Sequence, residues 1–257
     1  MFKVLAVAGV MLPSAAMAQS QMALLAGWAL PEGGRMIGVE VQLDPGWKTY
    51  WRVPGAGGIP PLFDWSASEN LGTAQVHWPA PEVFRENGMV SFGYRDRVVF
   101  PVELLPARPD QPIEVGLTLD YGVCEAVCVP VQESGRLGPE PDGTLAASFD
   151  IEDALAARPT SAGDAGIVSV ACMIDAPDRM TALLTFDSFP PDSSVPVFES
   201  GDPTLSILPD TMAATADTLT ISARIAPRGA GPSTLGDVRL TLLAPSFAAE
   251  IDGCSPA

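Results

Sequence analysis

The sequence feature that most constrains the fold is an alternating run that ends in a pair of cysteines. Apolar residues alternate with polar or small ones at Ile113, Val115, Leu117, Leu119 and Tyr121. This is the period of a half-buried strand. Cys124 ends the strand, and three residues later Cys128 opens the apolar run Val129-Pro130-Val131. Directly opposed residues in a non-hydrogen-bonded antiparallel pair lie about 4.5 Å apart at Cα, so a hairpin here allows a disulfide.

A disulfide across so short a connection contributes little as a staple. In the chain-entropy model, closing a loop of about 5 residues stabilises a fold by only ~2 kcal/mol, against ~4.5 kcal/mol for about 80 residues. A short bond at a turn suits opening and closing by another thiol. The sequence leaves two interpretations open, because many disulfides of exported proteins are inert.

Short strand patterns separated by proline and glycine run through the rest of the chain. The turn Asp44-Pro45-Gly46 separates two strand candidates, and Val53 to Pro61 reads as a loop. Further candidates are Met36–Leu43, Trp47–Trp51, Leu62–Trp65, Ala74–Trp78 and Val98–Leu104. So many short strands with few helical periods predict an all-β, antiparallel β-sandwich.

A second region follows a change in composition. Asp150 to Leu155 suits one helical turn, and 156–166 resembles a linker, which gives a first domain at 19–149, a connection at 150–166 and a second, smaller β-sandwich at 167–257. Its strand candidates are Ile167–Ile174, Ala182–Phe186, Val195–Phe198, Thr218–Ile225, Val238–Leu243 and Phe247–Ile251. Cys172 and Cys254 are natural partners for a structural disulfide, because a long loop gains most from a staple.

The first residues predict export. Lys3, the apolar run Val4–Leu12 and the small-x-small site Ala16-Met17-Ala18 form a signal peptide over 1–18, so we expect a secreted or periplasmic protein. No later apolar run approaches the length of a membrane helix. The net charge of −17 makes nucleic acid and anionic lipid poor partners.

The sequence lacks the residues that several common enzyme mechanisms require. The chain has one histidine, His77, where a zinc hydrolase normally uses two or three, and it has neither a nucleophile elbow nor a phosphate-binding glycine loop. We expect His77 to be a strand residue satisfied by local hydrogen bonds, and we expect no cofactor and no metal site of the usual kinds. Thiol–disulfide exchange remains, as does Cu(I) binding by the two thiolates with a methionine such as Met89. The stretch 120–132 contains Asp120 and Glu125 but no Lys or Arg, so its sequence neighbours disfavour a thiolate.

Several motifs in order resemble a known family. They are Tyr94-Arg-Asp-Arg-Val-Val-Phe-Pro-Val102, Leu119-Asp-Tyr-Gly-Val-Cys124 and Cys128-Val-Pro130. They resemble the amino-terminal periplasmic domain of DsbD, the thiol:disulfide interchange protein. Gly46 to Arg52 and His77 to Pro81 are similar to the ScsB branch, which is associated with suppression of copper sensitivity. The likeness covers residues 22 to 148, and the second β region looks like the extra domain of ScsB-type proteins.

The resemblance implies an immunoglobulin-like domain whose cysteine pair relays electrons. The family takes them from a membrane electron donor of the DsbD/CcdA type and passes them to periplasmic thioredoxin-fold proteins, including disulfide isomerases and cytochrome c biogenesis factors. The resemblance assigns mixed-disulfide formation to Cys128 and resolution to Cys124, and it makes Phe84 the candidate cap over the pair.

Three departures from the family pattern qualify these expectations. Three residues separate the cysteines where the best-known members have five, and Arg85 stands where they place a second aromatic. The chain ends at Ala257 without a membrane domain, so we expect the donor to be a separate protein. A copper(I)-binding module and a plain scaffold with two inert disulfides are the alternative hypotheses.

Overall fold

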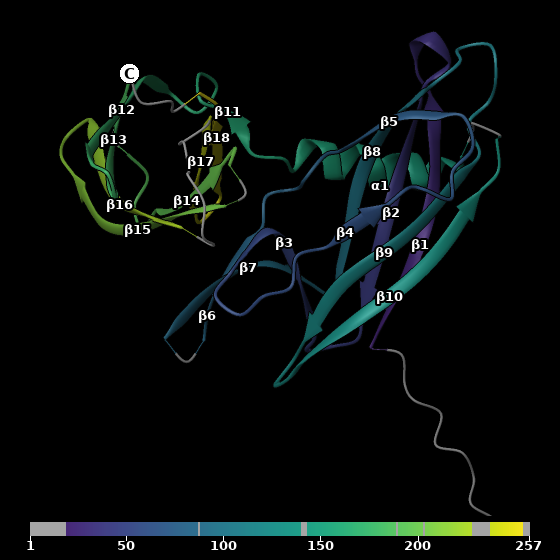
Figure 1. The fold of residues 1–257 in the computed structure, drawn as a ribbon, viewed down its shortest axis with the longest axis horizontal. Helices are drawn as coiled ribbons and strands as arrows, with labels where there is room; N and C mark the ends of the chain where they lie inside the picture. The colour runs from purple at the N-terminus through teal and green to yellow at the C-terminus, as the bar shows by residue number, and fades with distance from the viewer. Residues whose placement is uncertain are drawn as a thin grey trace, which may run out of the picture.

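The computed structural model describes residues 19–86, 88–139, 143–188, 190–202, 204–227 and 237–253. The fold consists of two antiparallel β-sandwiches, each made of two facing sheets (Figure 1). The first, coloured purple to teal, is the larger, and the second, green to yellow, packs beside the end of the first that carries β6 and β7. The predicted all-β sandwich class is therefore confirmed.

The first sandwich pairs a four-stranded sheet with a six-stranded sheet. The smaller sheet has the order β1 (Ser20–Ala29), β2 (Arg35–Leu43), β8 (Arg97–Pro106) and β5 (Leu71–Val76). The larger has the order β10 (Cys128–Leu137), β9 (Val115–Cys124), β3 (Lys48–Gly55), β7 (Met89–Arg95) and β6 (Glu82–Glu86), with β4 (Leu62–Asp64) also paired to β9. A 3-10 turn, η1 (Pro31–Gly33), connects β1 to β2.

The second sandwich consists of two four-stranded sheets. One has the order β11 (Thr160–Ser161), β18 (Phe247–Ile251), β17 (Val238–Ala244) and β14 (Val195–Ser200). The other has the order β12 (Ile167–Ala176), β13 (Arg179–Phe186), β16 (Thr218–Pro227) and β15 (Leu205–Ala214). The two-residue β11 runs parallel to β18, and the other pairs are antiparallel.

Strand alternation sorts the side chains of β2 between two layers. Ile37, Val39 and Val41 join the core between the sheets of the first sandwich. Met36 lies on the other face, where it packs with Ile151 of helix α1 (Leu145–Ala156). Gly38 leaves room for that helix, since a Cβ there would lie 2.9 Å from Cγ1 of Ile151. The first sandwich is therefore covered on one outer face by α1.

The two sandwiches are in direct apolar contact. Val197 of β14 and Leu243 of β17 are buried within the core cluster of the first sandwich, while most of the buried residues of the second sandwich form a core of their own.

The connection between the sandwiches differs from the prediction. Helix α1, with 12 residues, is longer than the expected single turn, and part of the predicted 156–166 linker forms β11. The predicted domain limits at 149 and 167 stay predictions.

Other element predictions need correction. β3 continues through Pro54 to Gly55, where the sequence predicted a loop from Val53. We did not predict β1, β6, β7 or β15. The predicted signal peptide, 1–18, lies outside the described residues. Within the described part of the chain, no helix is long and apolar enough to cross a membrane.

Candidate functional site

The two cysteines face one another across the β9–β10 hairpin, as the sequence predicted. Ten residue pairs form this ladder, from Val115 opposite Leu137 to Cys124 opposite Cys128 at the tip. Cys124 and Cys128 form a disulfide with their Cα atoms 4.1 Å apart. The long ladder fixes the register, so the two sulfurs stay adjacent whether or not they are bonded.

The two cysteine residues differ in exposure to solvent. Cys124 is the last residue of β9 and is buried, with 2% of its surface exposed. Cys128 begins β10 and is exposed, together with the connecting residues 125–127. Val127, beside Cys128, has 71% of its surface exposed. A protein thiol approaching from solvent therefore reaches Cys128 and not Cys124.

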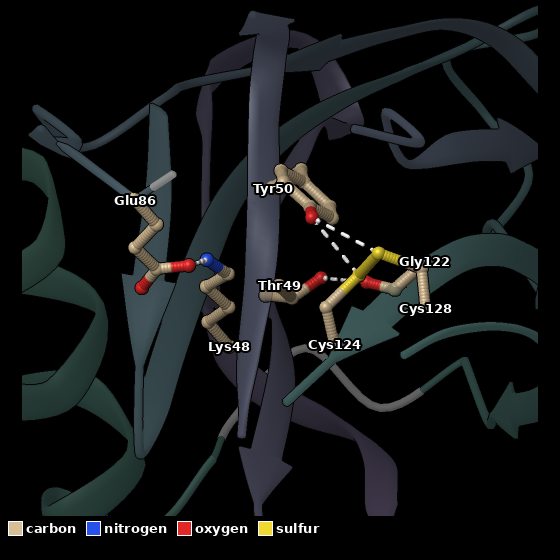
Figure 2. Close-up of a disulfide and its surroundings, with 7 residues drawn as sticks. All are labelled: Lys48, Thr49, Tyr50, Glu86, Gly122, Cys124 and Cys128. Carbon is tan, nitrogen blue, oxygen red and sulfur yellow. Dashed lines mark hydrogen bonds and ion pairs between the residues drawn. A yellow bond between two sulfur atoms is a disulfide. The ribbon is translucent and has the colours of Figure 1, made fainter. Parts of the chain in front are cut away.

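A tyrosine on the neighbouring strand contacts both sulfurs. The hydroxyl of Tyr50 in β3 donates a hydrogen bond to Sγ of Cys124 at 2.9 Å and lies 3.3 Å from Sγ of Cys128 (Figure 2). Burial, followed by the negative charge of Glu86, raises the pKa of Tyr50, so the hydroxyl stays protonated and remains a donor. The sequence analysis missed this residue. Its one signal was the aromatic strand Trp47–Trp51, which does not say which ring faces the sulfurs.

Tyr50 is held from two directions. Beside it, Thr49 pairs with Val123 of β9 and donates a hydrogen bond to the carbonyl of Gly122 at 2.9 Å. The loop after β3 lies over the ring, because a Cβ on Gly58 would lie 2.7 Å from Cδ1 of Tyr50. Only glycine allows so close an approach without a shift of the loop or the ring. The glycine-rich stretch thus covers the tyrosine that contacts the disulfide.

The candidate cap, Phe84, occupies a different part of the sheet. It is buried on β6, and its ring lies 4.9 Å from Nζ of Lys48 and 4.5 Å from the guanidinium of Arg95. Lys48 stands opposite Cys124 in the β3–β9 ladder, but its ammonium extends toward β6 and pairs with Glu86 (Figure 2). The side-chain hydroxyl that contacts the two sulfurs belongs to Tyr50, and a cap role for Phe84 stays a prediction.

His77 lies apart from the cysteine pair, directly after β5. Its Nδ1 lies 3.2 Å from Nη1 of Arg158, and its Nε2 lies 3.7 Å from a carboxylate oxygen of Glu103. Burial, with the Arg158 guanidinium second, lowers the pKa of His77, so the ring is neutral near pH 7. The ring thus has polar partners, but the hydrogen-bonding one lies 81 positions away and is not local. His77 also follows β5 and is not part of it.

Met89 lies too far from the cysteines to complete a copper site with them. Met89 begins β7, six residues before Arg95. Arg95 pairs with Lys48 of β3, and Lys48 in turn pairs with Cys124 of β9. At about 3.3 Å per residue this separates Met89 from the pair by about 20 Å along the strands. Among the described residues, no group of three or more His, Cys, Asp or Glu side chains is arranged to hold a metal ion.

Only one of the two cysteines of the second predicted disulfide lies among the described residues. Cys172 lies in β12 and is buried in the core of the second sandwich. Cys254 lies outside the described residues, so a Cys172–Cys254 structural disulfide stays a prediction.

Comparison with known proteins gives two findings. Residues 16–137 match the family model for the N-terminal part of the thiol:disulfide interchange protein DsbD. The fold is similar to the crystal structure of the N-terminal periplasmic domain of ScsB from Proteus mirabilis, with a TM-score of 0.74 and 24% identity over 94% of this chain and 95% of that one. No curated protein sequence gives a match. At this identity the structural likeness shows a shared fold, which is immunoglobulin-like in the DsbD amino-terminal domain.

Proposed function

Because residues 16–137 match the family model for the amino-terminal part of DsbD, we propose that this protein relays electrons through Cys124 and Cys128. A membrane donor of the DsbD/CcdA type supplies the electrons, and periplasmic thioredoxin-fold proteins receive them. The proposed compartment is the periplasm, supported by the signal-like residues 1–18 and by the periplasmic domain whose fold the chain shares.

The unequal exposure of the two cysteine residues carries the proposal. Disulfide exchange requires a thiolate to reach one sulfur along the S–S axis while the other leaves. Cys128 is open to solvent and Cys124 is covered, so one sulfur accepts attack and the other leaves into a protected site. An inert structural disulfide needs no such asymmetry, because neither of its sulfurs meets a partner.

The exchange proceeds in two balanced steps. A donor thiolate attacks Sγ of Cys128, the Cys124–Cys128 bond breaks, and Cys124 leaves as a thiolate beside the Tyr50 hydroxyl. The second donor thiol loses its proton and attacks the mixed disulfide, which releases Cys128 and leaves the donor as a disulfide. Two electrons have moved to the cysteine pair, and its two thiolates take up protons from water in place of the two that the donor thiols released to water. The reverse sequence, with Cys128 attacking an oxidised recipient, passes them on.

The surroundings of Cys128 suit contact with another protein. Val127 at the hairpin tip and Ile59, which lies against Gly122 two residues before Cys124, are exposed apolar side chains, with 71% and 36% of their surfaces accessible. Exposed apolar groups close to a reactive side chain are typical of protein-binding surfaces. They support a protein partner as the natural reactant of this disulfide, in preference to a small thiol.

Trapping tests the proposal with a matched pair of variants. Cys124→Ser leaves Cys128 without a resolving thiol, so mixed disulfides with thioredoxin-fold proteins should accumulate in periplasmic extracts. Cys128→Ser leaves only the buried Cys124, and it should trap far less. Equal trapping by the two variants, or none by either, would contradict the assigned roles.

The reduction potential provides a second, independent test. Equilibration with glutathione should place the Cys124–Cys128 couple within the range of exchange proteins. Structural disulfides have potentials below about −300 mV. A value in that structural range would count against the relay.

A further inference from the structure

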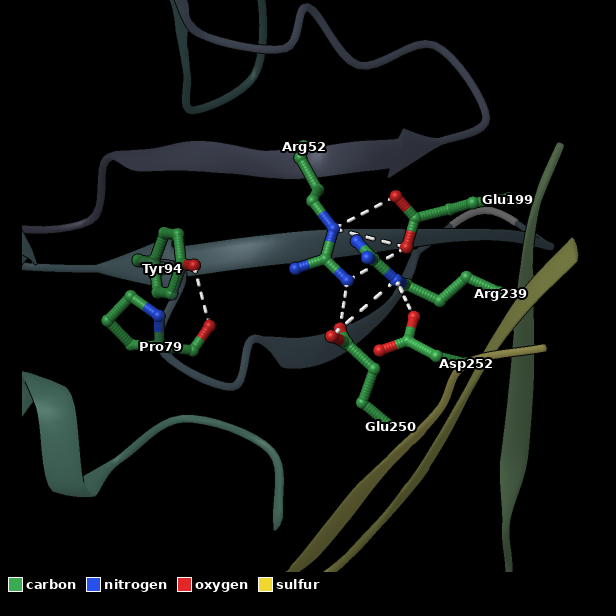
Figure 3. Close-up of polar contacts among 7 residues, drawn as sticks. All are labelled: Arg52, Pro79, Tyr94, Glu199, Arg239, Glu250 and Asp252. Atoms are coloured by element: carbon green, nitrogen blue, oxygen red, sulfur yellow. Dashed lines mark hydrogen bonds and ion pairs between the residues drawn. The ribbon is translucent and has the colours of Figure 1, made fainter. Parts of the chain in front are cut away.

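The second sandwich contacts the strand that carries Tyr50 through a cluster of charged side chains. Nε and Nη2 of Arg52 in β3 donate to the carboxylate of Glu199 in β14 at 2.9 and 2.8 Å, and Nη2 also pairs with Glu250 in β18 (Figure 3). Arg239 of β17 extends the cluster by pairing with Glu250 and Asp252. Arg52 is thus ion-paired with two carboxylates from the second sandwich.

The ladder that supports β3 stops at Tyr50. β3 pairs with β9 only at Lys48 and Thr49. Its pairing with β7 runs from Lys48 to Tyr50 and resumes only at Gly55. Tyr50 is therefore the last ladder-paired residue before a gap, and its backbone orientation depends on what holds the chain just beyond it.

Arg52 is the polar anchor inside that gap. Its side chain has 14% of its surface exposed, and those of Glu199 and Glu250 have 22% and 24%. A two-point guanidinium–carboxylate contact that is largely shielded from water is stronger and more directional than an exposed ion pair. The guanidinium also stacks on the ring of the buried Trp51 at 4.2 Å. The segment after Tyr50 is consequently fixed from outside its own sheet.

From this arrangement we propose that Arg52 is a positioning residue for the redox site. The second sandwich, through Glu199 and Glu250, holds Arg52 and thereby keeps the Tyr50 hydroxyl on the two sulfurs. This gives the second sandwich a function, which is to set how readily the Cys124–Cys128 bond opens. The inference rests on the proposed function for its biological meaning, whereas its test needs no physiological partner.

The test measures the rate of reduction of the folded, oxidised protein by dithiothreitol. Arg52→Gln removes the charge and the two-point contact with Glu199. It should slow opening of the disulfide several-fold, because the Tyr50 hydroxyl is no longer held in contact with the leaving sulfur. Arg52→Lys keeps a charge without the two-point contact and should lie between the wild type and Arg52→Gln. Arg97→Gln is the matched control, since Arg97 also joins two carboxylates, Glu40 and Asp150, but away from β3.

A double-mutant cycle separates positioning from general loosening. If Arg52 acts through the hydroxyl, Arg52→Gln should have little further effect on the reduction rate when Tyr50 is already Phe. Additive effects on the rate, or an Arg52→Gln rate equal to that of Arg97→Gln, would overturn the inference. Replacing Glu199 and Glu250 together by Gln is a second route to the same result and leaves Arg52 in place.

The outcomes also distinguish this inference from the proposed relay. A several-fold, non-additive effect of Arg52→Gln on reduction supports positioning even if trapping finds no partner. Successful trapping with an unchanged reduction rate in Arg52→Gln supports the relay and refutes the positioning role.

Discussion

Tyr50→Phe isolates the contribution of a single hydroxyl to opening of the disulfide. The ring is buried, and Phe fills the same space, so the substitution removes little besides the 2.9 Å hydrogen bond to Sγ of Cys124. A hydrogen bond to a charged group contributes about 1.5–3 kcal/mol, and one to a neutral group about 1 kcal/mol. Only the difference between these values changes the rate, because the bond already exists to the neutral sulfur before reduction. The difference is about 0.5–2 kcal/mol, of which we take about 1.4 kcal/mol, which corresponds to about tenfold in rate.

The assay follows reduction of the disulfide by excess dithiothreitol, with samples alkylated at intervals and weighed by mass spectrometry. Tyr121→Phe is the matched control, because Tyr121 is also a buried tyrosine of the same sheet but bonds Ser20 and Glu133 instead of sulfur. We expect Tyr50→Phe to be about tenfold slower than the wild type and Tyr121→Phe to be within about twofold of it. Equal rates for Tyr50→Phe and the wild type would refute the assigned role.

The pH dependence of the reduction rate provides a second test of the same prediction. Because the pKa of Tyr50 is raised, its hydroxyl remains a donor through the neutral and mildly alkaline range. The ratio of wild-type to Tyr50→Phe rate constants should therefore stay constant from about pH 7 to about pH 9. A ratio that falls toward one within this range would mean that the hydroxyl ionises there, against the reasoning.

Three further predictions concern the supports of the site. Gly58→Ala forces the loop or the Tyr50 ring to move, so we expect a loss of about 1–3 kcal/mol in urea unfolding and slower reduction by dithiothreitol; unchanged values for both would contradict the close packing. The pKa of Glu86 is lowered by its hydrogen bond to Lys48, so the pair stabilises the fold above the carboxyl's unfolded pKa and loses this effect as pH falls through the folded one. The melting temperature of Glu86→Gln should accordingly fall below that of the wild type at neutral pH and converge with it in acid, and a constant difference would exclude this cause. Ile151→Ala removes the fully buried side chain that docks α1 and should cost about 3 kcal/mol in urea unfolding, whereas a loss under about 1 kcal/mol would show that the helix contributes little.

The hairpin could be predicted from the sequence because its information is local. The alternation before Cys124 and the three-residue connection to Cys128 define two strands and their register without reference to the rest of the chain. The sandwich class followed in the same way from repeated short strands and turns. Features set by neighbouring residues were therefore accessible, including the disulfide.

Two of the differences between the predicted and the observed strands, the missed β15 and the longer β3, involve proline. β15 contains Pro209 beside a register shift, and it lies at the edge of its sheet, where a missing backbone donor is tolerated. Pro54 similarly falls in the part of β3 where ladder pairing with β7 lapses. Proline reads as an end of a strand, but at an edge or a gap it does not interrupt any pairing.

The contacts around the sulfurs could not be read from the sequence, because distant segments supply them. Tyr50 meets Cys124 across 74 positions of the chain, and Arg52 meets Glu199 across 147. Nothing in the local pattern gives the register of β3 against β9. The expectation that acidic neighbours disfavour a cysteine thiolate considered only the stretch 120–132. The Tyr50 hydroxyl, which donates to the sulfur of Cys124, comes from another strand.

The ten-pair ladder behind the disulfide has a consequence for how the protein withstands repeated use. By thermodynamic linkage, a disulfide that holds a fold together becomes harder to reduce by the amount of stability it confers. Here hydrogen bonds along β9 and β10 already keep the two strands in place, so breaking the covalent link at the tip costs the fold only the roughly 2 kcal/mol of a short loop closure. In the proposed relay, the couple therefore cycles between its two oxidation states without unfolding the domain, and the immediate surroundings of the sulfurs set most of its potential.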